Sequence, residues 1–235
     1  KHFMASQVFV PTPDCGLSAV ASVPLPNGVT TLHICHGSVL EFRGTSGSDL
    51  GAAAIVNAAN EGCVAGFGLD EQVNNIGGWK LKEARKQLGG CPTGQARITS
   101  SFGFVERNAV EWIIHAVGPV YRENRVRKAA APTEQQRDHL LASAYRAALE
   151  VARSNQGGST IRSVAFPLLS AGVFRGEKSL FEICEIAIQA IQASCCEGER
   201  EQQDEPLQHI YLTAFTEEEQ EALVTSFKKL LGAEF

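Results

Sequence analysis

Short apolar runs that alternate with amphipathic segments of helical length constrain the fold of this chain more than any other feature. The run at 53–59 has no polar face, as in a strand that is buried on both sides, and the runs at 110–121 and 159–172 are predicted as buried strands as well. The segment at 29–37, which alternates and begins with β-branched residues, and the segment at 209–215 predict two further strands. Because helices of crossover length separate these strands, we predict an α/β fold in which helices cover both faces of a mostly parallel sheet.

The segments between these strands predict helices with recognisable ends. In 131–155, Thr133 can cap the first turn, and the apolar residues fill one face of the helix. The helix at 69–90 is expected in two pieces, because Gly77 and Gly78 interrupt it. The remaining predictions are a turn and strand at 91–103, an amphipathic helix at 177–194, a charged surface loop at 195–206, and a final helix at 216–232 capped by Thr216.

The N-terminal segment has a different character. Residues 5–28 contain several prolines and small residues, which predict an irregular arm with one short strand at 7–10. Met4 is the only methionine, so residues 1–3 are interpreted as a remnant ahead of the native start, and no secretory signal follows Met4. The predicted organisation is an N-terminal arm at 1–28 and one domain at 29–235.

Composition excludes several classes of function. The net charge of −5 argues against a general nucleic-acid binder, which would present a basic face. No apolar run reaches the length of about 20 residues that a membrane-spanning helix needs. The chain has seven cysteines but no C-x-x-C pair, so we expect reduced thiols and a cytoplasmic or nuclear protein. We predict no metal site and no cofactor.

Two of the predicted strands end in turns of small residues, one containing Gly66 and Gly68 and the other at 170–172. Backbone N–H groups without bulky side chains can approach a pyrophosphate, and a helix N-terminus adds partial positive charge. Because ligands of open α/β sheets bind outside the carboxyl ends of the strands, the two turns are expected to line one crevice. The alternative is two ordinary turns. A G-x-G-x-x-G dinucleotide motif is weak here, because Glu71 occupies the position of its last glycine.

At these residues the sequence resembles the macrodomain family, and specifically its MacroD-type branch. The resemblance is carried by IVNAAN, GFGLD, GGCPTGQARIT, IIHAVGPVY, VAFPLLSAGVFRGE and IYLTAF, in this order, over about residues 29–231. It implies a three-layer α/β/α sandwich with a mixed, mostly parallel central sheet that binds ADP-ribose. MacroD-type members remove ADP-ribose from modified acidic side chains and cleave O-acetyl-ADP-ribose, the by-product of sirtuin deacetylation, whereas other macrodomains only bind.

The resemblance also implies roles for individual residues. Asn60 would orient the distal ribose, and Asp70 would be required for turnover, the alternative being an ordinary helix-start acid. Because a helix N-terminus favours the ionised carboxylate, we hypothesise that Asp70 orients a water rather than takes up a proton. Asn57 is expected to be structural. The implied ADP-ribose-binding positions are Ser38, Val39, Asn60, Gly66, Gly68, Leu69, Ser170, Ala171, Gly172, Val173, Phe174 and Phe215.

Some positions depart from the family pattern or allow another interpretation. Ser38 stands where family members usually carry an aspartate that bonds the adenine amino group, and Phe67 interrupts a glycine run, where it could narrow the distal-ribose pocket or act as a lid. Phe174 would pack over the distal ribose and Phe215 beside adenine, although either could be a core or loop aromatic. His115 lies within an apolar strand and is expected to be a satisfied core histidine.

The leading hypothesis is a hydrolase of mono-ADP-ribosylated aspartate or glutamate that also deacetylates O-acetyl-ADP-ribose. Its expected partners are ADP-ribose, ADP-ribosylated proteins and O-acetyl-ADP-ribose, and the protein is expected to be a monomer. One alternative is a non-catalytic module that reads ADP-ribose. Another is an unrelated α/β enzyme that binds a different nucleotide.

Overall fold

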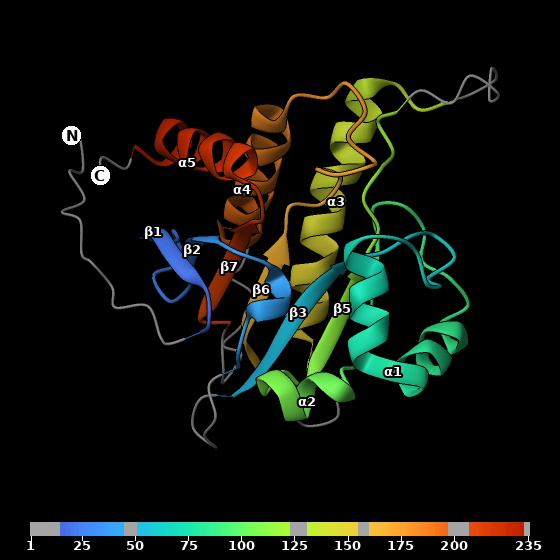
Figure 1. The fold of residues 1–235 in the computed structure, drawn as a ribbon. Coiled ribbons are helices and arrows are strands. Elements are labelled where there is room, and N and C mark those ends of the chain that lie inside the picture. The colour runs from blue at the N-terminus through green and yellow to red at the C-terminus, as the bar shows by residue number, and fades with distance from the viewer. Residues whose placement is uncertain (1–14, 45–50, 123–130, 155–159, 197–206, 233–235) are drawn as a thin grey trace.

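The fold is built on one mixed sheet of seven strands with helices on both of its faces (Figure 1). The computed structural model describes residues 15–44, 51–122, 131–154, 160–196 and 207–232. The elements in chain order are β1 (Ser18–Pro24), β2 (Thr31–His36), the 3-10 helix η1 (Val39–Glu41), β3 (Ala52–Ala58), α1 (Leu69–Gln87), β4 (Ala96–Ser100), α2 (Gly103–Asn108), β5 (Trp112–Ala116), α3 (Glu134–Arg153), β6 (Ile161–Pro167), α4 (Leu180–Cys196), β7 (His209–Ala214) and α5 (Glu217–Leu231).

The strand order across the sheet is β1-β2-β7-β6-β3-β5-β4. The five inner strands are parallel to one another, and the two edge strands, β1 and β4, pair antiparallel with their neighbours. The predicted mixed, mostly parallel sheet is therefore confirmed. Its parallel strands all end at one edge, so the loops that follow β2, β7, β6, β3 and β5 meet there.

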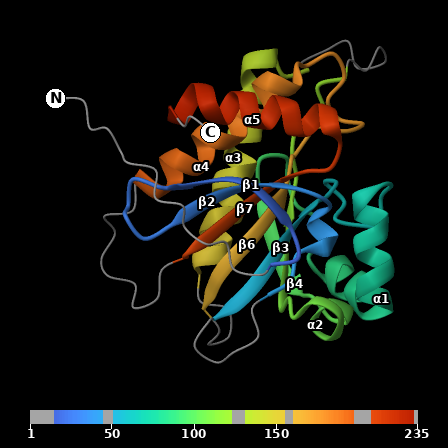
Figure 2. The same cartoon turned by 60° about the vertical axis from the view of Figure 1, so that its left-hand side comes forward.

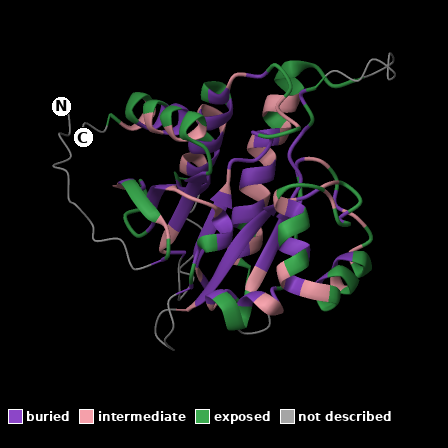
Figure 3. Ribbon diagram, viewed as in Figure 1, coloured by how far each residue is buried: buried purple, intermediate pink, exposed green. Residues whose placement is uncertain are grey.

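The helices form two outer layers, as the turned view shows (Figure 2). One face of the sheet packs against α3, α4 and α5, and the other packs against η1, α1 and α2. Strand β3 shows why its sequence lacks a polar face. Ala54 and Val56 belong to the first core, and Ala53 and Ile55 belong to the second, so this strand is buried on both of its faces (Figure 3).

The predicted helix ends agree with the structure. Thr133 caps α3 and Thr216 caps α5, and each forms a capping box with the residue three positions later. Helix α1 is interrupted at Gly78, whose φ of 71° and ψ of −163° lie outside the helical region. The predicted break of this helix is therefore confirmed.

Two predictions of local structure need correction, and one helix was not predicted. Residues 18–24, expected in an irregular arm, form edge strand β1, because their backbone pairs with β2. Residues 195 and 196, expected in a charged loop, complete α4, and helix α2 was not predicted. The predicted strand at 7–10 and most of the predicted loop at 195–206 lie outside the described residues.

Candidate functional site

The predicted site residues lie on loops at the carboxyl edge of the parallel strands. The N–H of Gly37 donates to the carbonyl of Ala214 at 2.9 Å, which joins the ends of β2 and β7. The N–H of Ala59 donates to the carbonyl of Ala116 at 2.9 Å, which joins the ends of β3 and β5. The turns that follow these strands, together with the turn that follows β6, therefore share one edge of the sheet.

Asp70 lies in the first turn of α1, as predicted, but its side chain is buried and faces protein donors. The Nδ2 of Asn57 donates to Asp70 Oδ1 at 2.5 Å, and Arg85 Nη1 lies 2.7 Å from the same oxygen. The backbone N–H of Gly66 donates to Oδ2 at 2.6 Å. Only 4% of the surface of Asp70 is exposed. The carboxylate therefore ties the first glycine turn to the sheet and to the far half of α1.

Behind Asp70 lies a chain of buried polar side chains. The Nδ2 of Asn57 also lies 3.2 Å from His115 Nδ1, and His115 Nε2 lies 3.0 Å from Thr99 Oγ1. Burial, assisted by the nearby charge of Arg85, lowers the pKa of His115 to about 3, so its ring is neutral at pH 7. His115 is thus a satisfied core histidine, and Asn57 is a structural residue, as expected. Asn57 contacts Asp70 rather than loop backbone.

Asn60 closes the turn that leads to Gly66. Its Nδ2 donates to the carbonyl of Val64 at 2.8 Å, and the N–H of Val64 donates to Asn60 Oδ1 at 3.4 Å. A Cβ atom placed on Gly66 would lie 2.9 Å from Asp70 Oδ2 and 3.2 Å from Asn60 Nδ2. Only glycine fits between these two side chains without displacing one of them. The structure therefore brings Asn60, Gly66 and Asp70 together.

The next residues of the turn open toward solvent. Gly68, with a φ of 66°, begins α1, and no side chain caps this start of the helix in the described structure. Backbone N–H groups of the first turn are therefore open to a ligand. Phe67 lies between two glycines and is 92% exposed, so it contributes little to the core. Leu69 is half-buried.

Two buried hydrogen bonds fix the second turn, which follows β6. Ser170 has a φ of 59°, is buried, and donates from its Oγ to the carbonyl of Pro119 at 2.8 Å. The N–H of Leu169 donates to the hydroxyl of Tyr145 at 2.8 Å. A non-glycine residue with positive φ is uncommon and persists where the surrounding structure holds it. The next residue, Ala171, is still buried, whereas Gly172 and Val173 are exposed and Phe174 is half-buried.

A buried lysine anchors the far end of this second loop. Lys178 Nζ donates to Glu134 at 2.7 Å, to Asp138 at 3.1 Å and to Glu182 at 3.0 Å. The N–H of Tyr121 donates to the carbonyl of Phe174 at 2.7 Å. A cavity of about 650 Å³ adjoins this cluster. Its lining residues are Tyr121, Arg122, Glu134, Arg137, Gly176, Glu177, Lys178 and Glu182.

At the other end of the edge lie the residues predicted to meet adenine. Ser38 caps η1, because its Oγ accepts the N–H of Leu40 at 3.3 Å. Val39 is buried within this short helix. Phe215 is 69% exposed, which excludes the alternative that it belongs to the core. The Oε2 of Glu219 holds the start of α5 by accepting the N–H of Phe215 at 2.8 Å.

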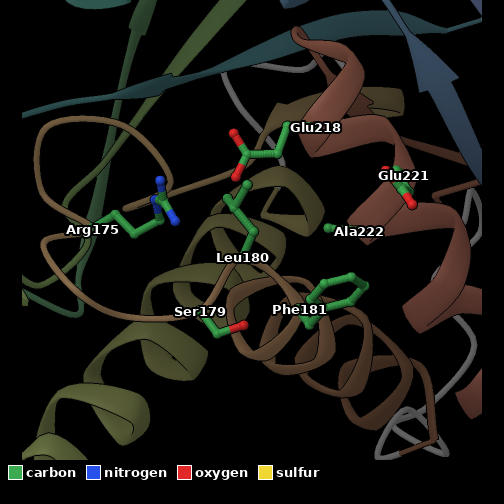
Figure 4. Close-up of a pocket in the computed structure, with 7 residues that line it drawn as sticks. All are labelled: Arg175, Ser179, Leu180, Phe181, Glu218, Glu221 and Ala222. Carbon is green, nitrogen blue, oxygen red and sulfur yellow. The ribbon is translucent and has the colours of Figure 1, made fainter.

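A smaller cavity, of about 300 Å³, lies between the starts of α4 and α5 (Figure 4). Arg175, on the loop after β6, and Glu218, on α5, both extend toward it in Figure 4. The other lining residues are Ser179, Leu180, Phe181, Glu221 and Ala222. Neither this cavity nor the one beside Lys178 is lined by Gly66 or by the residues at 170–172.

Two residues that stabilise the loops of the site, Arg85 and Lys178, were not predicted from the sequence. The partners of each residue lie on other elements or on other turns. Arg85 follows Leu81 by one helical turn, and both are buried. A charged residue on the apolar face of a helix is the signal that indicates a buried ion pair. Among the described residues, no cluster of His, Cys, Asp and Glu could hold a metal ion, and no helix is long and apolar enough to cross a membrane. All seven cysteines are free thiols.

Comparison with known proteins gives a consistent result. The family model of the Macro domain matches residues 56–181, which is more than half of the chain. A Macro domain-containing protein of Methanosarcina mazei is 36% identical over 146 residues, which are 62% of this chain and 65% of that protein, so the chain spans just under two thirds of its length. The O-acetyl-ADP-ribose deacetylase of Escherichia fergusonii is 32% identical over 164 residues, which are 68% of this chain and 77% of that protein.

Solved structures show the same similarity. The Oceanobacillus iheyensis macrodomain with ADP is 26% identical, with a TM-score of 0.68 over 90% of this chain and 97% of that one. The Trypanosoma brucei macrodomain in complex with ADP-ribose is 25% identical, with a TM-score of 0.61 over 83% of this chain and 68% of that one.

Proposed function

Because the chain belongs to the macrodomain family, we propose that it binds ADP-ribose across the carboxyl ends of its parallel strands and releases it by hydrolysis. The substrates are proteins mono-ADP-ribosylated on aspartate or glutamate, and O-acetyl-ADP-ribose. Water is consumed, and free ADP-ribose and the carboxylic acid are released. The similarity to a deacetylase of O-acetyl-ADP-ribose supports the second substrate. A monomer located in the cytoplasm or nucleus remains a prediction.

The observation that carries this proposal is the convergence of Asn60, Gly66 and Asp70 at the uncapped start of α1. The three residues pack so closely that a Cβ atom on Gly66 would lie 2.9 Å from Asp70 Oδ2 and 3.2 Å from Asn60 Nδ2. Backbone N–H groups there, together with those of the turn at 170–172, can hold the two phosphates of ADP-ribose. A protein with a net charge of −5 can thereby bind a dianion without a cluster of lysines.

The geometry favours separate roles for the two polar residues. Both oxygens of Asp70 accept hydrogen bonds or pair with a cation inside the protein, so its carboxylate acts by fixing the turn. Asn60 is only half-buried, and its amide can exchange its bonds within the loop for bonds to the distal ribose. The attacking water would then lie between this ribose and the diphosphate, whose negative charge assists its deprotonation. Phe174 and Phe215 are assigned to the two ends of the ligand, beside the distal ribose and adenine.

The test is release of ADP-ribose from a glutamate-linked, mono-ADP-ribosylated protein and from O-acetyl-ADP-ribose, with wild type beside Asn60→Ala. Binding of ADP-ribose is measured in parallel by calorimetry, with NAD and ADP as competitors. We expect wild type to turn over both substrates and Asn60→Ala to lose most of the rate while it still binds. Wild type that binds ADP-ribose but releases none would contradict hydrolysis.

The second candidate function is a module that reads ADP-ribose without turnover. Two observations favour it. Phe67 projects from the glycine turn with 92% of its surface exposed, and Ser38 offers adenine a hydroxyl that already accepts a bond from Leu40. The same experiment separates the two functions, because a reader binds ADP-ribose but leaves the linkage to glutamate intact.

A further inference from the structure

Among the described residues outside the aromatic ones, Arg85 has the largest fully buried side chain, and its contacts lie on the first glycine turn and the start of α1. Its Nη1 lies 2.7 Å from Asp70 Oδ1, and its Nη2 donates to the carbonyl of Val64 at 3.3 Å. The positive charge of Arg85 also lies close enough to the thiol of Cys63 to influence its pKa. A buried charge that contacts both the turn and the start of α1 constrains them strongly, because separating it from its counter-ion would be costly.

The contact between Arg85 and Asp70 depends on the break in α1. Fifteen positions separate the two residues, which would place them about 22 Å apart along a straight helix. An arginine side chain cannot span that distance, yet the two groups are 2.7 Å apart. Gly78, with a φ of 71° and a ψ of −163°, redirects the chain, and Figure 1 shows the two halves of α1 running in different directions. This combination of angles is available essentially only to glycine.

The carbonyl of Val64 gives Arg85 a second connection to the proposed site. This oxygen accepts one bond from Asn60 Nδ2, at 2.8 Å, and another from Arg85 Nη2, at 3.3 Å. When the amide of Asn60 turns to a ribose hydroxyl, the carbonyl loses the first bond and keeps the second. A carbonyl oxygen has two lone pairs, so both states leave it satisfied. The turn can therefore keep its shape while Asn60 changes partner.

We propose that Arg85 is a positioning residue for the hydrolysis. It holds Asp70 and the carbonyl of Val64 in place, so that the turn stays formed when Asn60 engages the substrate. Because Arg85 is buried, we assign it an indirect role, through Asp70 and Val64. This inference rests on the proposed function, in which Asn60 binds the distal ribose.

The matched variants are Arg85→Met and Lys86→Met, which each remove one positive charge from the same half of α1. Lys86 is exposed, so its replacement controls for net charge. We expect Arg85→Met to lower kcat by about 10- to 100-fold, the loss that follows a small misplacement of reacting groups, with much less change in the Kd for ADP-ribose. Lys86→Met should match wild type. An Arg85→Met enzyme with the kcat of wild type would overturn the proposal, and so would losses of kcat and affinity in equal proportion.

Arg85→Lys keeps the test decisive where Arg85→Met fails to fold. Lysine retains the charge beside Asp70, but its single ammonium group cannot reproduce the fork that reaches both Asp70 and the carbonyl of Val64. We expect partial rescue: a folded enzyme whose kcat lies between those of wild type and Arg85→Met, or clearly below wild type where Arg85→Met is insoluble. A kcat equal to that of wild type would overturn the role of the fork.

A second readout separates this inference from the proposed function. Amide hydrogen exchange in residues 61–68 is measured by mass spectrometry, with and without ADP-ribose. Arg85→Lys should exchange faster than wild type in this segment, above all with ADP-ribose bound, whereas Lys86→Met should not. If wild type hydrolyses neither substrate, the proposed function fails, and the exchange data still decide whether Arg85 holds the turn. Equal exchange in wild type and Arg85→Lys would overturn the inference.

Discussion

The backbone N–H of Gly66 donates to the carboxylate of Asp70 at 2.6 Å, which joins the glycine turn to the helix that follows it. The same carboxylate pairs with Arg85 and accepts from Asn57. Asp70 is therefore not a solvent-facing acid at a helix start. Its buried carboxylate connects the glycine turn, strand β3 and the second half of α1. Its removal should affect stability and turnover together.

We expect Asp70→Asn to lower the free energy of unfolding by about 3–5 kcal/mol, because it leaves the buried Arg85 without its counter-ion. For a chain of this length the melting temperature should fall by roughly 10 °C. The measurement is urea unfolding and thermal melting. The control is Asp70→Asn/Arg85→Met, which removes both charges and should recover part of the loss. A stable but inactive Asp70→Asn would contradict the structural role and return Asp70 to the chemistry.

Gly66→Ala should weaken ADP-ribose binding and turnover. Its Cβ atom would lie 2.9 Å from Asp70 Oδ2 and 3.2 Å from Asn60 Nδ2, so one of these side chains must move. Gly62→Ala is the matched control in the same turn, because its Cβ atom would have no contact shorter than 3.4 Å. Calorimetry with ADP-ribose and the rate of ADP-ribose release test both variants. Equal behaviour of the two would show that the close approach at Gly66 is unimportant.

The inner sheet was predictable because its strands are apolar on both faces, a pattern that few other structures explain. Edge strand β1 could not be predicted in the same way. Most of its residues are exposed or half-exposed and it ends in proline, so its sequence resembles a loop. The positions of Asn60 and Asp70 followed from strand and helix ends. The direction of the Asp70 side chain could not be predicted, because it depends on the contact with Arg85. Arg85 reaches Asp70 only because α1 is broken at Gly78.

Phe67→Gly should leave stability unchanged within about 0.5 kcal/mol, because the ring is 92% exposed and packs against little. We expect it to raise kcat/KM for the protein substrate, on the hypothesis that the ring narrows the approach to the distal ribose. Phe67→Leu is the control, because it removes the aromatic ring but retains an apolar side chain at this position. The measurement is steady-state release of ADP-ribose. A lower kcat/KM in Phe67→Gly would instead show that the ring contacts the substrate productively.

Lys178→Met should loosen the loop that carries Phe174. Burial lowers the pKa of Lys178, but hydrogen bonds to Glu134, Glu182 and Asp138 outweigh this effect and raise it above its ordinary value of 10.5. Its contribution to stability is therefore complete below about pH 10 and is lost as the pH rises further. We expect Lys178→Met to cost about 1–3 kcal/mol and to weaken ADP-ribose binding.

The control for Lys178 is Lys229→Met. Lys229 Nζ lies 2.6 Å from Glu185, but its side chain is 66% exposed, so the pair should contribute about 0–1 kcal/mol. Thermal melting from pH 7 to pH 11 compares the two variants with wild type. If Lys178→Met and Lys229→Met melt alike, the buried cluster does not anchor the loop.

His33 should make the protein less stable in mild acid. Its ring is buried, lies 2.8 Å from Ser22 Oγ and 3.1 Å from His209 Nδ1, and stacks on Tyr211. Burial, assisted by His209, lowers the pKa of His33 from 6.5 to about 4. Between these values the unfolded chain takes up a proton that the native protein excludes. Stability should therefore fall as the pH drops from 6.5 toward 4.

The expected loss from His33 alone is about 2 kcal/mol between about pH 7.5 and about pH 5. His33→Gln retains groups that can bond Ser22 and His209 but cannot be protonated, so the fall in stability should be smaller by about this amount. Urea unfolding at the two pH values measures the difference, and His139→Gln, in α3, controls for the loss of one histidine outside the core. His33→Gln that loses as much stability in acid as wild type would show that His33 accepts its proton in the folded protein as readily as in the unfolded chain.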